Sequence, residues 1–181
     1  NMNVSFETTP NPATMKFNFS QNIAEASCNF QNMESTEKSP LAAKIFGFPW
    51  VSSVYIGENF ITVTKQDWVD WKVLAQPLSG LLTEHIASGQ PVLLTLTPAN
   101  DEIENDSEIV KKIKRILQNE IRPVVALDGG DIAFVKFENN KLFIRMMGAC
   151  SGCPSSEATL KQGIEVRIKE HFPEITEVLS V

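Results

Sequence analysis

The hydrophobic pattern of the first half of the chain predicts strands that alternate with helices. Apolar residues occupy every second position from Met15 to Phe19, which is the period of a half-buried strand. Residues 50–56 and 60–65 are rich in β-branched and aromatic side chains and flank the turn residues 57–59. This arrangement predicts a β-hairpin.

Capping residues indicate where helices begin around these strands. Ser39-Pro40 predicts a helix start, because a serine hydroxyl caps the first turn and proline fits within it. Asp67 is the predicted cap of a second helix, which we expect to be interrupted near Pro77 because proline has no N–H to donate. A further helix is predicted over residues 78–86, where apolar residues recur at spacings of three and four.

The second half of the chain begins with a predicted amphipathic helix. Asp106 or Ser107 is its expected cap, and Arg122-Pro123 ends or restarts it. Lysine and arginine side chains occupy its other side. Its apolar stripe consists of Ile109, Ile113, Ile116, Leu117 and Ile121.

A hairpin, a loop, a helix and a strand are predicted to follow. The Asp-Gly-Gly-Asp sequence at residues 128–131 predicts a turn with a positive φ. Residues 132–137 and 141–147 then form the expected hairpin. The last helix is predicted to start at Pro154, and the last strand covers residues 175–181.

The chain is expected to fold as two small domains. Residues 98–106 combine proline, asparagine and acidic side chains with little apolar surface, which predicts a solvated acidic linker. It separates an N-terminal domain, residues 1–97, from a C-terminal domain, residues 107–181. We expect each domain to pack a short β-sheet against helices, which is an α+β fold.

The charge of the chain disfavours two classes of partner. Its 181 residues carry a formal net charge of -6, whereas nucleic acids and acidic membranes both attract clustered lysine and arginine. Trp50, Trp68 and Trp71 are therefore expected in the core or at an interface rather than in a base-stacking platform. No apolar run approaches the roughly 20 residues that cross a bilayer. We expect a soluble protein that is not exported.

The most specific chemical signal is a pair of cysteines two residues apart, Cys150 and Cys153. This spacing lets both sulfurs converge on one metal centre. Pro154 fits the first turn of a helix, so Cys153 is expected near a helix N-terminus, where the dipole favours the thiolate. We expect an exposed loop on a rigid scaffold, and the motif alone leaves metal binding and disulfide exchange open.

The remaining titratable candidates carry less signal. A secreted disulfide framework needs an even and larger number of cysteines than the three in this chain. The cysteine count therefore favours a reducing compartment. Cys28 is interpreted as an incidental thiol, and His85 and His171 as structural or surface side chains. No constellation typical of catalysis is found, so we do not expect an enzyme.

Several motifs of the second half form one specific combination. They are Ile-Arg-Pro at residues 121–123, Leu-Asp-Gly-Gly-Asp at 127–131, the cysteine segment 148–156, and Leu-Lys-Gln-Gly-Ile-Glu at 160–165. In this combination residues 105–181 closely resemble the Nfu family, relatives of the NifU C-terminal domain. Ser151 departs from the glycine that relatives often have there, but it is also small.

The first half is similar to the N-terminal domain that many Nfu proteins carry. The similarity lies in residues 9–17, 39–42 and 60–65. Both halves match in the order of the family, so the resemblance covers most of the chain.

The resemblance implies that the protein carries an iron–sulfur cluster. A [4Fe-4S] cluster, with [2Fe-2S] as a second form, would be accepted from the assembly machinery, held between two subunits and passed to recipient apo-proteins. The implied ligands are Cys150 and Cys153. Coordination chemistry agrees, because such a cluster takes four thiolates and two chains related by a twofold axis supply two each.

The expected compartment is a bacterial cytoplasm, or the mitochondrial matrix for a processed organellar protein. Two other functions use the same pair of cysteines. One is a dithiol/disulfide oxidoreductase, although such a site usually follows the first strand of a βαβ unit rather than a hairpin. The other is a structural zinc site that bridges a dimer.

Overall fold

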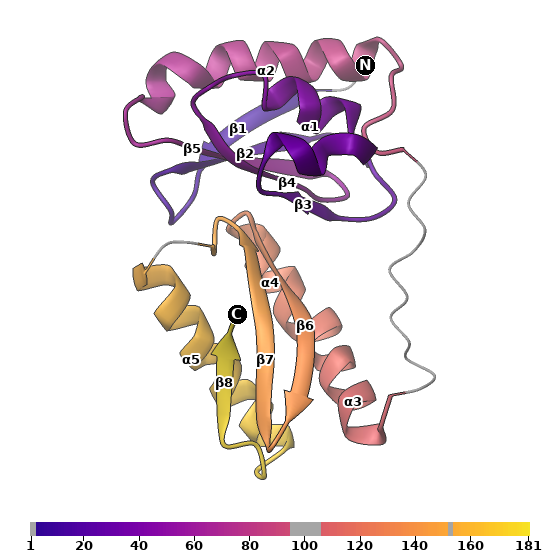
Figure 1. Ribbon diagram of the computed structural model, residues 1–181, viewed down its shortest axis with the longest axis vertical. Coiled ribbons are helices and arrows are strands. Elements are labelled where there is room, and N and C mark those ends of the chain that lie inside the picture. The colour runs from indigo at the N-terminus through magenta and orange to yellow at the C-terminus, as the bar shows by residue number, and fades with distance from the viewer. Residues whose placement is uncertain (1–2, 95–105, 152–153) are drawn as a thin grey trace. The chain divides into compact units, whose positions relative to one another are not determined.

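The protein divides into two compact units, Asn1–Ala99 and Asn100–Val181. The computed structural model describes residues 3–94, 106–151 and 154–181, and Figure 1 shows the elements of each unit. Each unit packs one sheet against helices, which confirms the predicted α+β fold. The predicted linker, residues 98–106, lies outside the described residues except for Asp106.

The first unit is built on a five-stranded antiparallel sheet with the order β1-β2-β5-β4-β3. The predicted strand near residues 15–19 and the predicted hairpin are confirmed, whereas the two edge strands were not predicted. One edge strand is mostly exposed and the other has three residues, so neither has a clear hydrophobic alternation. The strands are β1 (Val4–Thr8), β2 (Thr14–Phe19), β3 (Cys28–Phe30), β4 (Val51–Ile56) and β5 (Phe60–Lys65).

Among the described residues of this unit, the helical elements are the 3-10 turn η1 (Met33–Lys38), α1 (Pro40–Ile45) and α2 (Trp71–Ala87). The predicted start of α1 is confirmed. The buried Ser39 hydroxyl accepts from the Ala42 N–H at 2.9 Å and donates to the Val92 carbonyl at 2.7 Å. One side chain therefore caps the helix and fixes the segment that follows α2.

The prediction for α2 was wrong in two respects. Its cap is Asp70 rather than Asp67, and the helix runs without a break through Pro77. Pro77 cannot donate to the Val73 carbonyl four residues earlier. Because Pro77 is exposed and Val73 is 71% exposed, this turn faces water, which can hydrate that carbonyl.

The tryptophans divide between core and surface. Trp50 and Trp71 are buried, with ring centroids 5.6 Å apart in an edge-to-face contact. The expectation of a core position is therefore confirmed for these two residues. Trp68, which precedes the cap of α2, is 65% exposed and lies outside the core.

The second unit has a three-stranded sheet with the order β6-β7-β8. The predicted hairpin is confirmed: β6 and β7 are antiparallel, and Asn139 and Asn140 between them have φ of 53° and 61°. Two left-handed residues in succession make the tight turn that matches the twist of a hairpin. The last strand pairs in parallel with β7 and is shorter than predicted. The strands are β6 (Gly130–Glu138), β7 (Lys141–Gly148) and β8 (Glu177–Ser180).

The helices of this unit are α3 (Glu108–Ile116), the π-helical turn η3 (Leu117–Ile121), α4 (Arg122–Leu127) and α5 (Pro154–His171). Ser107 is the cap of α3, whereas Asp106 pairs with Lys114 at 2.6 Å. The Arg122 N–H bonds to the Leu117 carbonyl five residues earlier. Since Pro123 has no N–H to donate, the chain inserts a wider turn there and restarts as α4.

No helix within the described ranges is long and apolar enough to span a membrane.

A buried histidine joins the two helices of the first unit. His85 is 1% exposed, and its Nδ1 lies 2.9 Å from Lys44 Nζ while its Nε2 lies 3.0 Å from the Pro91 carbonyl oxygen. An ammonium group only donates, so Nδ1 accepts and the protonated Nε2 donates to the carbonyl. Burial lowers the pKa of His85, and the nearby Lys44 charge lowers it further. The structural role predicted for His85 is therefore confirmed.

We expect the first unit to lose stability as the pH falls below about 6.5, the ordinary pKa of histidine. The unfolded chain takes up the proton near that pH, whereas the folded chain resists it because the pKa of His85 is lowered. Tryptophan fluorescence during urea unfolding measures this, since all three tryptophans lie in the first unit. The variant His85→Gln should show a weaker dependence between about pH 7 and pH 5.5. If the stability of the wild type and of His85→Gln fell equally with pH, the assignment of this pH dependence to His85 would be contradicted.

Candidate metal centre

The cysteine loop leaves the sheet at the end of β7. Gly148, the last residue of the strand, has a φ of 66°, which favours glycine. The Ala149 N–H then donates to the Gly129 carbonyl at 3.0 Å, and the Ser151 N–H donates to the Gly148 carbonyl at 3.1 Å. The first of these bonds attaches the loop to the turn before β6, and the second closes the loop on itself. The predicted helix start at Pro154 is confirmed, whereas Gly152 and Cys153 lie outside the described residues.

The side chain of Cys150 points into the second unit rather than out of it. Cys150 is 7% exposed and belongs to the hydrophobic core of this unit. A Cβ added to Gly130 would lie 2.1 Å from Cys150 Sγ and 3.0 Å from a methyl group of Val125. The sulfur therefore occupies space that any side chain at position 130 would fill. The expectation of an exposed loop was wrong for this cysteine.

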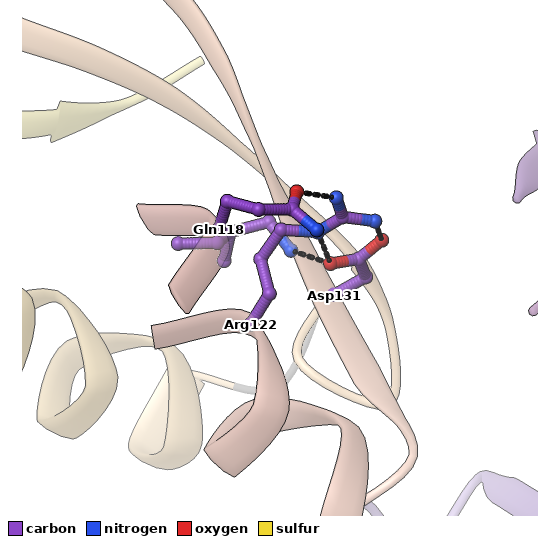
Figure 2. A network of polar contacts seen from close by, with 4 residues as sticks. Gln118, Arg122 and Asp131 are labelled. Carbon is purple, nitrogen blue, oxygen red and sulfur yellow. Dashed lines mark hydrogen bonds and ion pairs between the residues drawn. The ribbon is translucent and has the colours of Figure 1, made fainter. Parts of the chain in front are cut away.

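A buried ion pair fixes the turn on which the sulfur rests. Asp131 is 4% exposed, and its two carboxylate oxygens accept from Arg122 Nε at 2.8 Å and Nη2 at 3.0 Å. Gln118 accepts from the third guanidinium nitrogen of Arg122, and Asp131 also accepts from the Ile132 N–H at 2.8 Å. Figure 2 shows the guanidinium between the amide of Gln118 and the carboxylate of Asp131.

This network connects the helices to the sheet beside the cysteine loop. Gln118 lies in η3 and Arg122 begins α4, whereas Asp131 is the second residue of β6 and is opposite Met147 of β7. A two-bond contact between a guanidinium and a carboxylate fixes orientation as well as distance. The ion pair thus holds the start of β6, and with it Gly130, against α4. Sequence reasoning found this segment as a motif but missed the pairing, because nothing in the spacing indicates which charges meet.

The other candidate residues lie elsewhere in the fold. Cys28 is in β3 of the first unit, where partial burial raises the pKa of its thiol. His171 ends α5, and its Nε2 lies 3.7 Å from Glu120 Oε2 at a partly exposed position, as expected for a surface side chain. In the part of the chain that the structure describes, no three His, Cys, Asp or Glu side chains are grouped as metal ligands.

The variant Gly130→Ala should displace the Cys150 sulfur. Overpacking of this kind costs about 1–3 kcal/mol, so faster hydrogen exchange is expected in the amides of β6 and β7. Alkylation of the single thiol left in a Cys28→Ser/Cys153→Ser background should also become faster. Gly163→Ala is the matched control, since an added Cβ there meets nothing within 4 Å and should stabilise α5 by about 0.5–1 kcal/mol. Unchanged exchange and alkylation in Gly130→Ala would contradict the observed packing.

The stability losses from removing the Arg122 guanidinium and the Asp131 charge should not be additive. Arg122→Ala leaves the buried Asp131 carboxylate uncompensated, which we expect to cost about 2–4 kcal/mol. Asp131→Asn removes the charge but retains an acceptor for the Ile132 N–H. The double variant Arg122→Ala/Asp131→Asn should therefore lose less free energy of unfolding than the sum of the losses in the two single variants. Chemical denaturation followed by circular dichroism measures the three values. Strict additivity would show that the pair contributes no coupling.

Comparison with known proteins identifies the relatives of both units. The family model described as "Scaffold protein Nfu/NifU N terminal" matches residues 4–89, and the one described as "NifU-like domain" matches residues 113–179. A solution structure of a NifU-like protein from Saccharomyces cerevisiae is similar over 51% of this chain and 84% of its own, with 30% identity and a TM-score of 0.45.

Curated relatives align over nearly the whole chain. NifU-like protein 5, mitochondrial, of Arabidopsis thaliana is 41% identical over 96% of this chain and 66% of its own length. The human protein named NFU1 iron-sulfur cluster scaffold homolog, mitochondrial, is 36% identical over 99% of this chain and 72% of its own length. The chain thus spans about two thirds of the plant relative. Since both family models match in order and the human relative aligns over most of its length, this chain belongs to the Nfu family of NifU-like proteins.

Proposed function

We propose that the protein is an iron–sulfur cluster scaffold and carrier. The observation that carries this proposal is the pair of cysteines between β7 and α5, in a chain whose human relative is named an iron-sulfur cluster scaffold homolog. The cargo is a [4Fe-4S] cluster, and its ligands are Cys150 and Cys153 of two chains. The donor set fits this cargo, because thiolates are the usual ligands of such clusters.

The number of ligands supports a dimeric carrier. A [4Fe-4S] cluster takes four thiolates, whereas one loop supplies two. Twofold symmetry completes the set with identical residues from a second copy. A cluster held in this way is released when the interface loosens, since separation of the chains removes half of the ligands.

The packing of Cys150 adds a step to loading. Its thiol lies in the core against Gly130, so the side chain must turn outward before it can share a cluster with another chain. The residues beside it are small, namely Gly148, Ala149 and Ser151.

The proposed activity is carriage rather than catalysis. Cluster transfer proceeds by exchange of thiolate ligands, which needs no proton-shuttling base. The partners are the assembly machinery that supplies the cluster and the apo-proteins that receive it. Because the plant and human relatives are named mitochondrial, we assign the protein to the mitochondrial matrix rather than to a bacterial cytoplasm.

The packing of Cys150 also bears on the oxidoreductase alternative. Thiol–disulfide exchange requires an accessible attacking sulfur. Cys150 is 7% exposed, so in this conformation the attacking sulfur of an oxidoreductase would have to be Cys153, the thiol expected near the helix N-terminus. The zinc alternative differs in its product, which would be a colourless dimer without sulfide.

Anaerobic reconstitution with iron and sulfide tests the proposal. The wild-type chain should gain broad absorption near about 400 nm and about four irons per two chains. Cys150→Ser and Cys153→Ser should each abolish stable cluster binding, since either change leaves at most two ligands in a symmetric dimer. Cys28→Ser is the matched control and should load like the wild type, because Cys28 lies in the other unit. The proposal would be refuted if the Cys28→Ser variant could not retain iron. It would also be refuted if the wild-type protein bound zinc instead of iron and sulfide.

A further inference from the structure

The short helix α4 is apolar on its exposed side as well as on its buried side. Between Arg122 and Asp128 its residues are Pro123, Val124, Val125, Ala126 and Leu127. Val125 is buried, whereas Val124 is 62% exposed and Leu127 is 71% exposed. A surface helix normally presents polar side chains to water. We call the exposed surface of Val124 and Leu127 the α4 face.

The neighbouring helix α3 shows the ordinary arrangement. Its exposed positions include Lys112 and Arg115, and its apolar residue Ile113 is fully buried. The contrast lies within one unit, so it does not reflect the composition of the domain as a whole. Val124 and Leu127 are three residues apart and therefore lie on one side of the helix. A contiguous apolar patch of this kind on a protein surface typically marks a contact with another molecule.

The α4 face lies beside the cysteine loop. Val125, between the two exposed residues, and Cys150 both border Gly130, because an added Cβ there would lie 3.0 Å from a Val125 methyl group and 2.1 Å from the Cys150 sulfur. The Gly129 carbonyl, just after α4, accepts the hydrogen bond from the loop residue Ala149. In Figure 1, α4 and the end of β7 accordingly lie at the same end of the second unit.

The occupant of this face follows from the ligand number, and this step rests on the proposed function. If one cluster joins two cysteine loops, the loops must approach within the width of a cluster, so the surfaces next to each loop must meet the other chain. The second unit, residues 106–181, carries eleven acidic and eleven basic side chains and so has no net charge that would keep two cysteine loops apart. An apolar contact beside the cluster stabilises their association, because it removes apolar surface from water.

We propose that the α4 face is the contact surface for a second copy of this chain in the cluster-bound dimer. In a twofold dimer the same patch is presented by both chains. Val124 and Leu127 are then buried on loading, and each substitution affects the interface twice. The face determines how long the pair of chains retains its cluster.

The test uses the full chain, loaded anaerobically with iron and sulfide. Leu127→Glu and Val124→Glu each place a charge on the α4 face at a position that is exposed in one chain. Val166→Glu is the matched control, because Val166 is 56% exposed in the same unit but lies about 18 Å along α5 from Pro154. The readouts are the mass in solution by light scattering, the iron content per chain and the rate of cluster loss to a chelator.

We expect the two α4 variants to lower the dimer fraction of loaded protein and to speed cluster loss by about tenfold or more, as for central positions of an interface. Val166→Glu should resemble the wild type. Circular dichroism of unloaded protein checks the fold. If Leu127→Glu melts early, Leu127→Gln probes the same contact without a charge.

Two results would overturn this inference. One is a wild-type mass and rate of cluster loss in both α4 variants. The other is a wild-type dimer with slower transfer to an apo-protein, which would assign the face to the recipient. The proposed function fails separately, if loaded wild-type protein is monomeric or if Cys150→Ser retains a cluster.

Discussion

The ion pair between Arg122 and Asp131 is the contact on which the arrangement of the cysteine loop depends. A carboxylate that is 4% exposed is costly to bury unless a partner compensates its charge. The partner comes from the first residue of α4, and the wider turn η3 places Gln118 at the same guanidinium. The pair therefore requires α4 to begin where it does. It also holds Gly130, the neighbour of Asp131, under the Cys150 sulfur.

The elements that could be predicted from the sequence are those with a strong local signal. The alternation from Met15 to Phe19 and the turn residues of both hairpins predicted strands that the structure confirms. The start of α1 was also correct, because a Ser-Pro pair favours one local conformation. At Pro77, by contrast, the local signal predicted a break that the helix does not have. The local preference of proline against the helix interior is overridden because the affected carbonyl can be hydrated.

The features that could not be predicted depend on contacts between distant residues. The Asp-Gly-Gly-Asp sequence indicated a turn, and Gly129 indeed has a φ of 79°. Nothing in the sequence showed that the second glycine leaves space for a cysteine twenty positions later, or that Asp131 pairs with Arg122. The cysteine pair itself was found from spacing alone. The inward direction of the Cys150 side chain was not predicted, since a position in a loop suggests exposure.

The inward position of Cys150 has a consequence for the resistance of its thiol to oxidation. Oxidation of a thiol to sulfenic acid, and then irreversibly to sulfinic acid, depends on its access to peroxide. A sulfur that behaves as a small apolar side chain in the core is shielded from this damage. In this conformation the fold thus keeps Cys150 in reduced form.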